Sequence, residues 1–434
     1  MKTYPEYKSS GIDWLGEIPS HWGVISGKWA VNFTYGFPAD SKLFSIEKKG
    51  LPLIRIRDIY STDTEVYYEG DDYPSESIIN NGDLLIGMDG DFNVSRWRGT
   101  RAILNQRVCK YEDSEAISKN YMFYILPLIL NEINATKYAT TVKHLSATDL
   151  SEMKLTVPPM QEQAVIAAYL DDVTGKVDAL IAEKQKQVED LRDYRNSIIT
   201  ETVTRGINPD AHLRPSGVDW LGDIPEHWKD TKLKYLVTKV GSGITPRGGA
   251  EVYSDSGILF LRSQNIYDDG LHLDDPKYIS TEIDEDMSNS RVFKNDLLLN
   301  ITGASIGRCY LYNLEESANV NQHVCIVRVM EKISPLYLKL VINSRIGQTQ
   351  IALYQTGGNR EGLNYEQLRN FYIPLPPLSE QLQIADYLDE KTAKIDTLIE
   401  ELEAQLGDLA TYKQAVITEA VTGKVDVRDW TPKS

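Results

Sequence analysis

The sequence predicts an α+β protein in which two long antiparallel coiled-coil helices separate two β-rich domains, related by a pseudo-two-fold axis. Two observations carry this prediction. The chain repeats two blocks of sequence, and each copy of the second block runs into a long helical pattern. The period is about half of the 434 residues, which indicates two half-molecules and not a solenoid. A chain of this length is also too long for one compact core.

The repeated blocks define a shared frame. SGIDWLGEIPSHW from Ser10 returns as SGVDWLGDIPEHW from Ser216, with ten of 13 positions identical. VPPMQEQAVIAAYLDD from Val157 returns as LPPLSEQLQIADYLDE from Leu375. The segments between the blocks show little similarity overall. We therefore divide the chain into frame and variable segments in the order frame, variable, frame, variable, frame, with the boundaries 1–23, 24–156, 157–229, 230–374 and 375–434.

Each long helical pattern contains a predicted coiled-coil seam. Positions that alternate steps of four and three are apolar at eight of ten places in each helix, which is typical of a coiled coil. A proline pair precedes each pattern and sets the helix start. We expect the two helices to pack on each other, the alternative being that each packs on its own half. The seam residues are Ile166, Leu170, Val173, Val177, Leu180, Leu191 and Ile198, and then Ile384, Leu388, Ile395, Leu398, Leu402, Leu409 and Val416.

The variable segments are predicted to be mixed α+β domains with one fold. Short apolar runs alternate with Gly, Asn and Asp, as in LPLIRIRDIY from Leu51 and LFLRSQNIYDDG from Leu259. Arg55 matches Arg262, and Asn105-Gln106 matches Asn321-Gln322, at corresponding places in the two segments. Matched strands with unmatched loops predict two domains that share a framework and differ at their surface.

The net charge of −17 opposes simple nucleic-acid binding, because phosphate neutralisation normally requires a basic surface. The charge is uneven along the chain. By our count residues 24–156 hold 15 basic and 18 acidic side chains, and residues 230–374 hold 15 and 17. The shared frame therefore carries most of the net negative charge. It forms either a solvated acidic surface or a docking surface for a basic partner.

Several classes of protein are excluded by missing motifs. The sequence has no GxxxxGK[ST], GxGxxG or HExxH pattern, and no Asn-Pro-Pro-Tyr of the kind that adenine methyltransferases use. Three cysteines without a CxxC argue against disulfides and zinc knuckles. No apolar run approaches the ~20 residues that span a bilayer, and the N-terminus lacks a secretory h-region. We therefore expect a cytoplasmic protein without catalytic or metal-binding residues.

The repeated blocks resemble a known family. WLGxIPxHW, PPLxEQxxIxxYLD and the helix end TEAVTGKxD, with two unlike segments between them, resemble the specificity subunit of type I restriction–modification systems. The resemblance covers nearly the whole chain, and the first copy of the second block departs from the pattern at Met160 and Gln161. It implies that the variable segments are target recognition domains, each reading one half of a bipartite site in double-stranded DNA. The helices would act as a spacer.

The resemblance also implies partners. The chain would dock two modification subunits and the restriction subunits, without catalysing a reaction or binding a cofactor itself. The partner subunits would use S-adenosylmethionine to methylate adenine at N6, and ATP and Mg to cleave unmodified DNA. The chain would reside in the cytoplasm with no membrane contact.

The residues expected to contact DNA carry donors and acceptors suited to bases or phosphates. The resemblance favours the Thr-Pro loop and the Gly-Gly-Asn-Arg loop of the second domain. Arg55 and Arg262 repeat, which indicates a shared fold or phosphate role more than base specificity. The candidates are Arg55, Arg57, Arg96, Arg98, Arg101, Lys143 and His144 in the first domain, and Ser242, Thr245, Arg247, Arg262, Gln264, Asn265, Arg308, Asn359 and Arg360 in the second.

A second interpretation stays open from the residues alone. An acidic coiled-coil scaffold with two protein-binding heads would have the same charge and the same lack of catalytic motifs. The two interpretations differ in how the candidate residues are distributed. A DNA reader should gather them on one face of each head, whereas a scaffold should scatter them.

Overall fold

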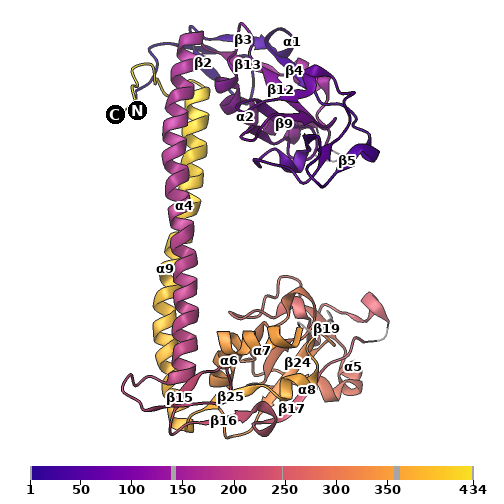
Figure 1. The fold of residues 1–434 in the computed structure, drawn as a ribbon, viewed down its shortest axis with the longest axis vertical. Coiled ribbons are helices and arrows are strands. Elements are labelled where there is room, and N and C mark those ends of the chain that lie inside the picture. Colours follow the sequence, from indigo (N-terminus) through magenta and orange to yellow (C-terminus); the bar gives the residue numbers. More distant parts are fainter. Residues whose placement is uncertain (1, 138–142, 247, 356–361, 433–434) are drawn as a thin grey trace. The chain divides into compact units, whose positions relative to one another are not determined.

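The structure, a computed structural model, describes residues 2–137, 143–246, 248–355 and 362–432. The chain divides into two compact units, the first comprising Met1–Lys184 and Ala404–Ser434 and the second Gln185–Glu403. Each unit contains one mixed head and one half of a pair of long helices (Figure 1). The α+β prediction with two β-rich domains and two long helices is confirmed.

Head 1 contains two sheets. The first is antiparallel and has the order β10-β9-β12-β4, and the second has the order β5-β7-β6-β11-β8 with β6 and β11 parallel. Helix α2 (Lys119–Lys137) packs against the first sheet. The strands are β4 (Asn32–Tyr35), β5 (Phe44–Ser45), β6 (Leu51–Ile54), β7 (Tyr67–Tyr68), β8 (Ile78–Ile79), β9 (Leu84–Gly87), β10 (Val94–Arg96), β11 (Ala102–Leu104) and β12 (Val108–Glu112).

Head 2 repeats this plan with different lengths. Its sheets have the orders β17-β24-β21-β22 and β19-β18-β23-β20, with β18 and β23 parallel. Helices α5 (Thr281–Asp286), α6 (Pro335–Asn343) and α7 (Arg345–Gln355) complete it. The strands are β17 (Val237–Ser242), β18 (Ile258–Leu261), β19 (Lys277–Ile279), β20 (Arg291–Val292), β21 (Leu297–Asn300), β22 (Cys309–Leu311), β23 (Ala318–Val320) and β24 (Val324–Val329).

Each head begins and ends with two paired strands at its boundary with the frame. β3 (Gly23–Ser26) leads into head 1, and β13 (Lys154–Val157) leaves it and pairs with β3 in antiparallel register. In unit 2, β16 (Lys229–Lys232) and β25 (Tyr372–Leu375) pair in the same way. A head therefore leaves the frame and returns to it at one place. The remaining frame hairpins are β1 (Tyr7–Ser9) with β2 (Glu17–Pro19), and β14 (Leu213–Pro215) with β15 (Asp223–Pro225).

The repeated Pro-x-His-Trp motif anchors the frame to the long helices. Trp22 is fully buried, and its indole N–H donates to the Glu162 carboxylate at 3.0 Å. His21 lies 2.8 Å from the other oxygen of Glu162. In unit 2 the equivalent His227 lies 2.9 Å from Glu380. The histidines therefore pair with the first turn of each long helix.

Helices α4 (Met160–Arg205) and α9 (Leu378–Val421) run antiparallel in both units. In unit 1 the ammonium of Lys413 lies 2.6 Å from the carboxylate of Asp178. In unit 2, Arg192 pairs with Glu403 at 2.7 Å. The prediction that the two helices pack on each other is confirmed.

The inner face of the helix pair differs in part from the predicted seam. Leu180 and Leu398 are 46% and 48% exposed, so the prediction is wrong at these two positions. The cause is a local change of spacing at Thr174 and its counterpart Thr392, which are buried. In each helix the buried isoleucine, leucine and threonine follow one another at four-residue steps, where the predicted seam has a step of four and then a step of three. The residues on the inner face are therefore Ile181 and Ile399, each one residue after the predicted leucine. The other predicted seam residues are buried or half-buried: Ile166, Leu170, Val173, Val177, Leu191, Ile198, Ile384, Leu388, Ile395, Leu402, Leu409 and Val416.

Two further features concern the cysteines and the helices. Cys109, Cys309 and Cys325 are buried and free, and Cys109 and Cys325 occupy the corresponding strands β12 and β24. Across the described ranges, no helix has the length and apolar character needed to cross a bilayer.

Candidate nucleic-acid interface

Four loops of head 1 converge at one edge of its sheets. They follow β4, β9 and β11, and the fourth precedes α3 (Ala147–Glu152). Backbone hydrogen bonds join them: Met88 N–H donates to the Arg107 carbonyl at 2.9 Å, and Leu145 N–H donates to the Met88 carbonyl at 2.7 Å. Gly36 lies so close to the β11–β12 loop that a Cβ there would come within 2.2 Å of a backbone oxygen. We call this group of loops the loop cluster of head 1.

The side chains of this loop cluster are charged and partly exposed. His144 Nδ1 lies 2.6 Å from Asp89 Oδ1, and Arg107 Nη1 lies 3.2 Å from the same imidazole nitrogen. Lys143 Nζ lies 3.4 Å from Asp91. The ion-paired groups retain between 38% and 80% exposure, so their remaining donors and acceptors face solvent. Lys143 and His144, both predicted from the sequence, are therefore brought together with Arg107.

Head 2 has the same loop cluster. Its four loops follow β17, β21 and β23, and the fourth precedes α8 (Tyr365–Arg369). Ile301 N–H donates to the His323 carbonyl at 3.0 Å, and Leu363 N–H donates to the Ile301 carbonyl at 2.8 Å. These are the equivalents of the bonds at Met88 in head 1. Gly243 makes the same close approach as Gly36, here to the backbone of Val320.

The side chains of this second loop cluster that the structure describes and that contact one another are neutral hydroxyl, amide and imidazole groups. Thr302 Oγ1 and His323 Nδ1 lie 2.6 Å apart, and Gln322 Nε2 lies 3.0 Å from His323 Nε2. The predicted residue Thr245 donates a hydrogen bond to Gln322. The hydroxyl of the predicted residue Ser242 forms a hydrogen bond with the Tyr365 hydroxyl. At corresponding places the two heads therefore have the same backbone bonds and different side chains.

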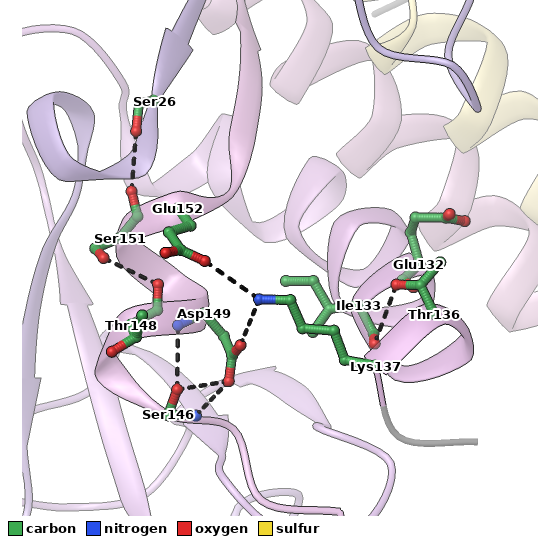
Figure 2. A network of polar contacts seen from close by, with 10 residues as sticks. All are labelled: Ser26, Glu132, Ile133, Thr136, Lys137, Ser146, Thr148, Asp149, Ser151 and Glu152. Atoms are coloured by element: carbon green, nitrogen blue, oxygen red, sulfur yellow. Dashed lines mark hydrogen bonds and ion pairs between the residues drawn. The ribbon is translucent and has the colours of Figure 1, made fainter. Parts of the chain in front are cut away.

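The loop that carries Lys143 and His144 is held by a polar network at its C-terminal end. Ser146 and Asp149 cap α3 reciprocally, with the Ser146 N–H donating to Asp149 at 2.9 Å. Lys137, in the last turn of α2, pairs with Asp149 at 2.8 Å and reaches Glu152 at 3.4 Å. Figure 2 shows these groups converging on one place. The network fixes the C-terminal end of the loop that carries Lys143 and His144 to helices α2 and α3.

The two repeated arginines serve the fold. Arg55 caps the short helix η2 (Ile56–Asp58), and its guanidinium makes a two-pronged ion pair with Asp58 at 2.8 and 3.2 Å. Arg262 takes the same place before η6 (Ser263–Asn265) and donates to the Asp275 carbonyl at 3.0 Å. Asn265 is only 4% exposed, and its amide bonds backbone groups of Arg262 and His272. This burial argues against a DNA contact by Asn265.

The arginines after β9 do not join the loop cluster of head 1. Arg96 and Arg98 instead line a hollow of about 470 Å³ against the helix pair of unit 1, together with the exposed Tyr60. Arg96 pairs with Asp171 at 2.6 Å and its guanidinium stacks on Phe123 at 4.2 Å.

In head 2, Arg308 forms part of a stack. Its guanidinium lies 4.2 Å over the ring of Tyr267, and the His272 ring stacks on Tyr267 at 3.9 Å. The remaining predicted residues that the structure describes, Arg57, Arg101 and Gln264, are exposed. Arg247, Asn359 and Arg360 lie outside the described residues.

Sequence reasoning missed Arg107, Gln322, His323 and Tyr365. The first three follow or belong to the repeated Asn-Gln pair, and the change from Arg107 to His323 directly after it was a usable signal. Tyr365 had no such signal, because its contact with Ser242 spans 123 residues. Within the described ranges, no group of three His, Cys, Asp or Glu side chains could hold a metal ion.

Comparisons with known proteins agree with this architecture. The family model described as "Type I restriction modification DNA specificity domain" matches residues 38–190 and 225–407. The type I restriction enzyme EcoBI specificity subunit of Escherichia coli is 32% identical, over 98% of this chain and 90% of its own length. The MjaVIII specificity subunit of Methanocaldococcus jannaschii is 25% identical, over 82% of this chain and 81% of its own.

A solved structure shows the same fold. A chain from the work entitled "Structural basis underlying complex assembly and conformational transition of the type I R-M system" aligns with a TM-score of 0.69. The alignment covers 93% of this chain and 98% of that one, at 17% identity. With the family model matching most of its length, this chain belongs to the family of type I restriction–modification specificity subunits, which recognise DNA sequences.

Proposed function

We propose that the two heads read the two different halves of one bipartite DNA site. The observation that carries this proposal is the loop cluster, which has the same backbone bonds in both heads and different side chains. Head 1 presents Asp89, Arg107 and His144, whereas head 2 presents Thr302 and His323. Paired donors and acceptors on base edges discriminate sequence, so different sets select different half-sites.

The way in which each head joins the frame supports independent reading. β3 and β13 pair side by side where head 1 leaves the frame and returns to it. An exchanged head must also fit the helix pair, because Arg96 pairs with Asp171 and the Tyr121 hydroxyl donates to the Val421 carbonyl. We propose that α4 and α9 act as the spacer between the half-sites, so that their length sets the number of unread bases.

The chain in this proposal catalyses no reaction and acts through docked subunits. Two modification subunits would supply adenine-N6 methylation with S-adenosylmethionine, and restriction subunits would supply ATP- and Mg-dependent cleavage. The net charge of −17 supports this division, because a chain this acidic neutralises few phosphates by itself. We expect weak DNA binding by the isolated chain and tight binding once modification subunits are present.

The test is an exchange of heads. Residues 24–156 are replaced by the corresponding segment of a relative with a different site, and the methylated motif is sequenced in cells that also express the modification subunit. We expect one half of the motif to change and the other half to stay. The reciprocal exchange of residues 230–374 is the matched control and should change the other half. A motif that is unchanged in both exchanges would contradict the proposal.

A further inference from the structure

Two large aromatic side chains stand exposed at equivalent places in the two units. Trp29, in the single-turn helix α1 (Gly27–Ala30), is 80% exposed, and Tyr235, at the end of η4 (Leu233–Tyr235), is 61% exposed. Each follows the last residue of the strand that leads into its head by three positions. Aromatic side chains contribute most to binding when their 150–250 Å² are buried. Exposure of a large ring at the same place in both units, and not exposure alone, points to a surface that a partner covers.

Both aromatic residues project from turns that are fixed to the end of the same variable segment, next to the place where the chain returns to the frame. Gly27 N–H donates to the Met153 carbonyl at 2.7 Å, and Leu233 N–H donates to the Phe371 carbonyl at 2.8 Å in the equivalent place. A Cβ at Gly27 would lie 2.1 Å from the Leu150 carbonyl oxygen. The Ser26 hydroxyl also donates to the Ser151 carbonyl at 2.9 Å (Figure 2). The turns are thus preorganised, which reduces the entropy cost of binding.

Each exposed ring carries a lysine beside it. Lys28 Nζ lies 5.3 Å from the Trp29 ring centroid, and Lys234 Nζ lies 5.1 Å from that of Tyr235. Each ammonium group therefore places a positive charge beside an exposed ring. A surface made of a flat ring and an ammonium group fits an apolar pocket edged by carboxylates.

The strand register places these aromatic residues away from the loop clusters. In head 1 the first strand after Trp29 is β4, whose Asn32 lies opposite Glu112 and whose Tyr35 lies opposite Cys109. The loop cluster begins beyond Tyr35, so Trp29 precedes the opposite end of the strand. In head 2, β17 likewise runs from Val237 to the loop cluster beyond Ser242. The exposed rings are therefore not part of the candidate DNA interface.

We propose that Trp29 and Tyr235 are the anchor residues for two copies of one protein partner, one docked on each unit. The heads differ in the side chains of their loops, so a feature that both units keep serves something common to both. Under the proposed function, on which this inference rests, that partner is the modification subunit. Its docking surface would hold an apolar pocket with carboxylates at the rim.

The test measures how many modification subunits bind the full chain by native mass spectrometry, at a concentration that saturates the unaltered chain. We expect two subunits on the unaltered chain, one on Trp29→Ala, one on Tyr235→Ala and none on the double variant. Each lost site should weaken by tenfold or more, as for anchor residues in other interfaces. Trp29→Phe should restore the second subunit.

The control and the contrary outcomes are distinct. Ile46→Ala removes a side chain that is 84% exposed in head 1, and it should leave two subunits bound. Two subunits of unchanged affinity on the double variant would overturn the assignment of the anchor residues while leaving the proposed function intact. No binding by the unaltered chain would overturn the docking in the proposed function and this inference with it.

Discussion

Arg195 and Asp396 form a two-pronged ion pair that joins α4 to α9 in unit 2, with Nε to Oδ1 at 2.8 Å and Nη2 to Oδ2 at 3.1 Å. Their counterparts in the repeat, Lys413 and Asp178, form a 2.6 Å pair in unit 1. The acid lies on α9 in one unit and on α4 in the other. Both halves of the helix pair therefore use one register, which the repeated sequence specifies twice.

The Arg195–Asp396 pair predicts a measurable coupling. In a double-mutant cycle with Arg195→Ala and Asp396→Ala, we expect a coupling of about 0.5–1 kcal/mol in the free energy of unfolding, since both side chains are partly exposed. The Lys394–Glu390 pair, which lies on one helix and is largely exposed, is the control and should give about 0.5 kcal/mol or less. Equal coupling for the two pairs in urea denaturation would contradict the assigned geometry.

The displaced seam predicts opposite results for adjacent residues. Ile399→Asp places an unpaired charge at a position that is 9% exposed, and should cost about 3 kcal/mol or more. Leu398→Asp alters a side chain that is 48% exposed and should change the free energy of unfolding by about 0.5 kcal/mol or less. Thermal melting of the two variants checks this. A larger loss of unfolding free energy for Leu398→Asp than for Ile399→Asp would contradict the displaced seam and support the regular heptad spacing.

Asp63 predicts a local pH response in head 1. Hydrogen bonds from Lys48, Tyr67 and the Thr64 N–H stabilise its carboxylate and lower its pKa to about 2. A lowered pKa stabilises the loop above the ordinary pKa of aspartate, and this contribution is lost as the pH falls towards 2. We expect Lys48→Met to raise the pKa of Asp63 towards its ordinary value, as measured by NMR titration. An unchanged midpoint would show that Lys48 is not the main cause.

The loop clusters predict separate losses of specificity. His144→Ala should relax one half of the methylated motif, and His323→Ala should relax the other, because each imidazole belongs to one head. The expected discrimination lost at the affected base pair is about 1–3 kcal/mol. Motif sequencing with each variant measures it. If either variant relaxes both halves, the heads do not read independently.

The frame could be predicted from the sequence because its two copies share most of their residues and the same spacing. The seam could be predicted only in part. Thr174 and Thr392 are polar, so a pattern of apolar residues does not place them on the inner face, although both are buried. The neighbouring Val173 is apolar and fits the regular spacing, so the extra four-residue step cannot be recognised from the sequence. The step is visible only when the partner helix shows which side each residue faces.

The candidate site was less accessible from the sequence than the fold. Arg55 and Arg262 carry the right chemistry for DNA, yet their bonds to nearby residues engage them in the fold. Conversely, Arg107 and His323 gain their place from loops that meet through backbone bonds across long separations in sequence. Residue type identifies groups that could contact DNA, whereas tertiary contacts decide which of them meet.

The most direct test of the central claim is methylome sequencing of cells that express this chain with its modification subunit, against cells that lack only this chain. The account predicts a new methyladenine motif in two unequal halves separated by unspecified bases. No new motif, in cells where the complex is shown to assemble, would contradict it.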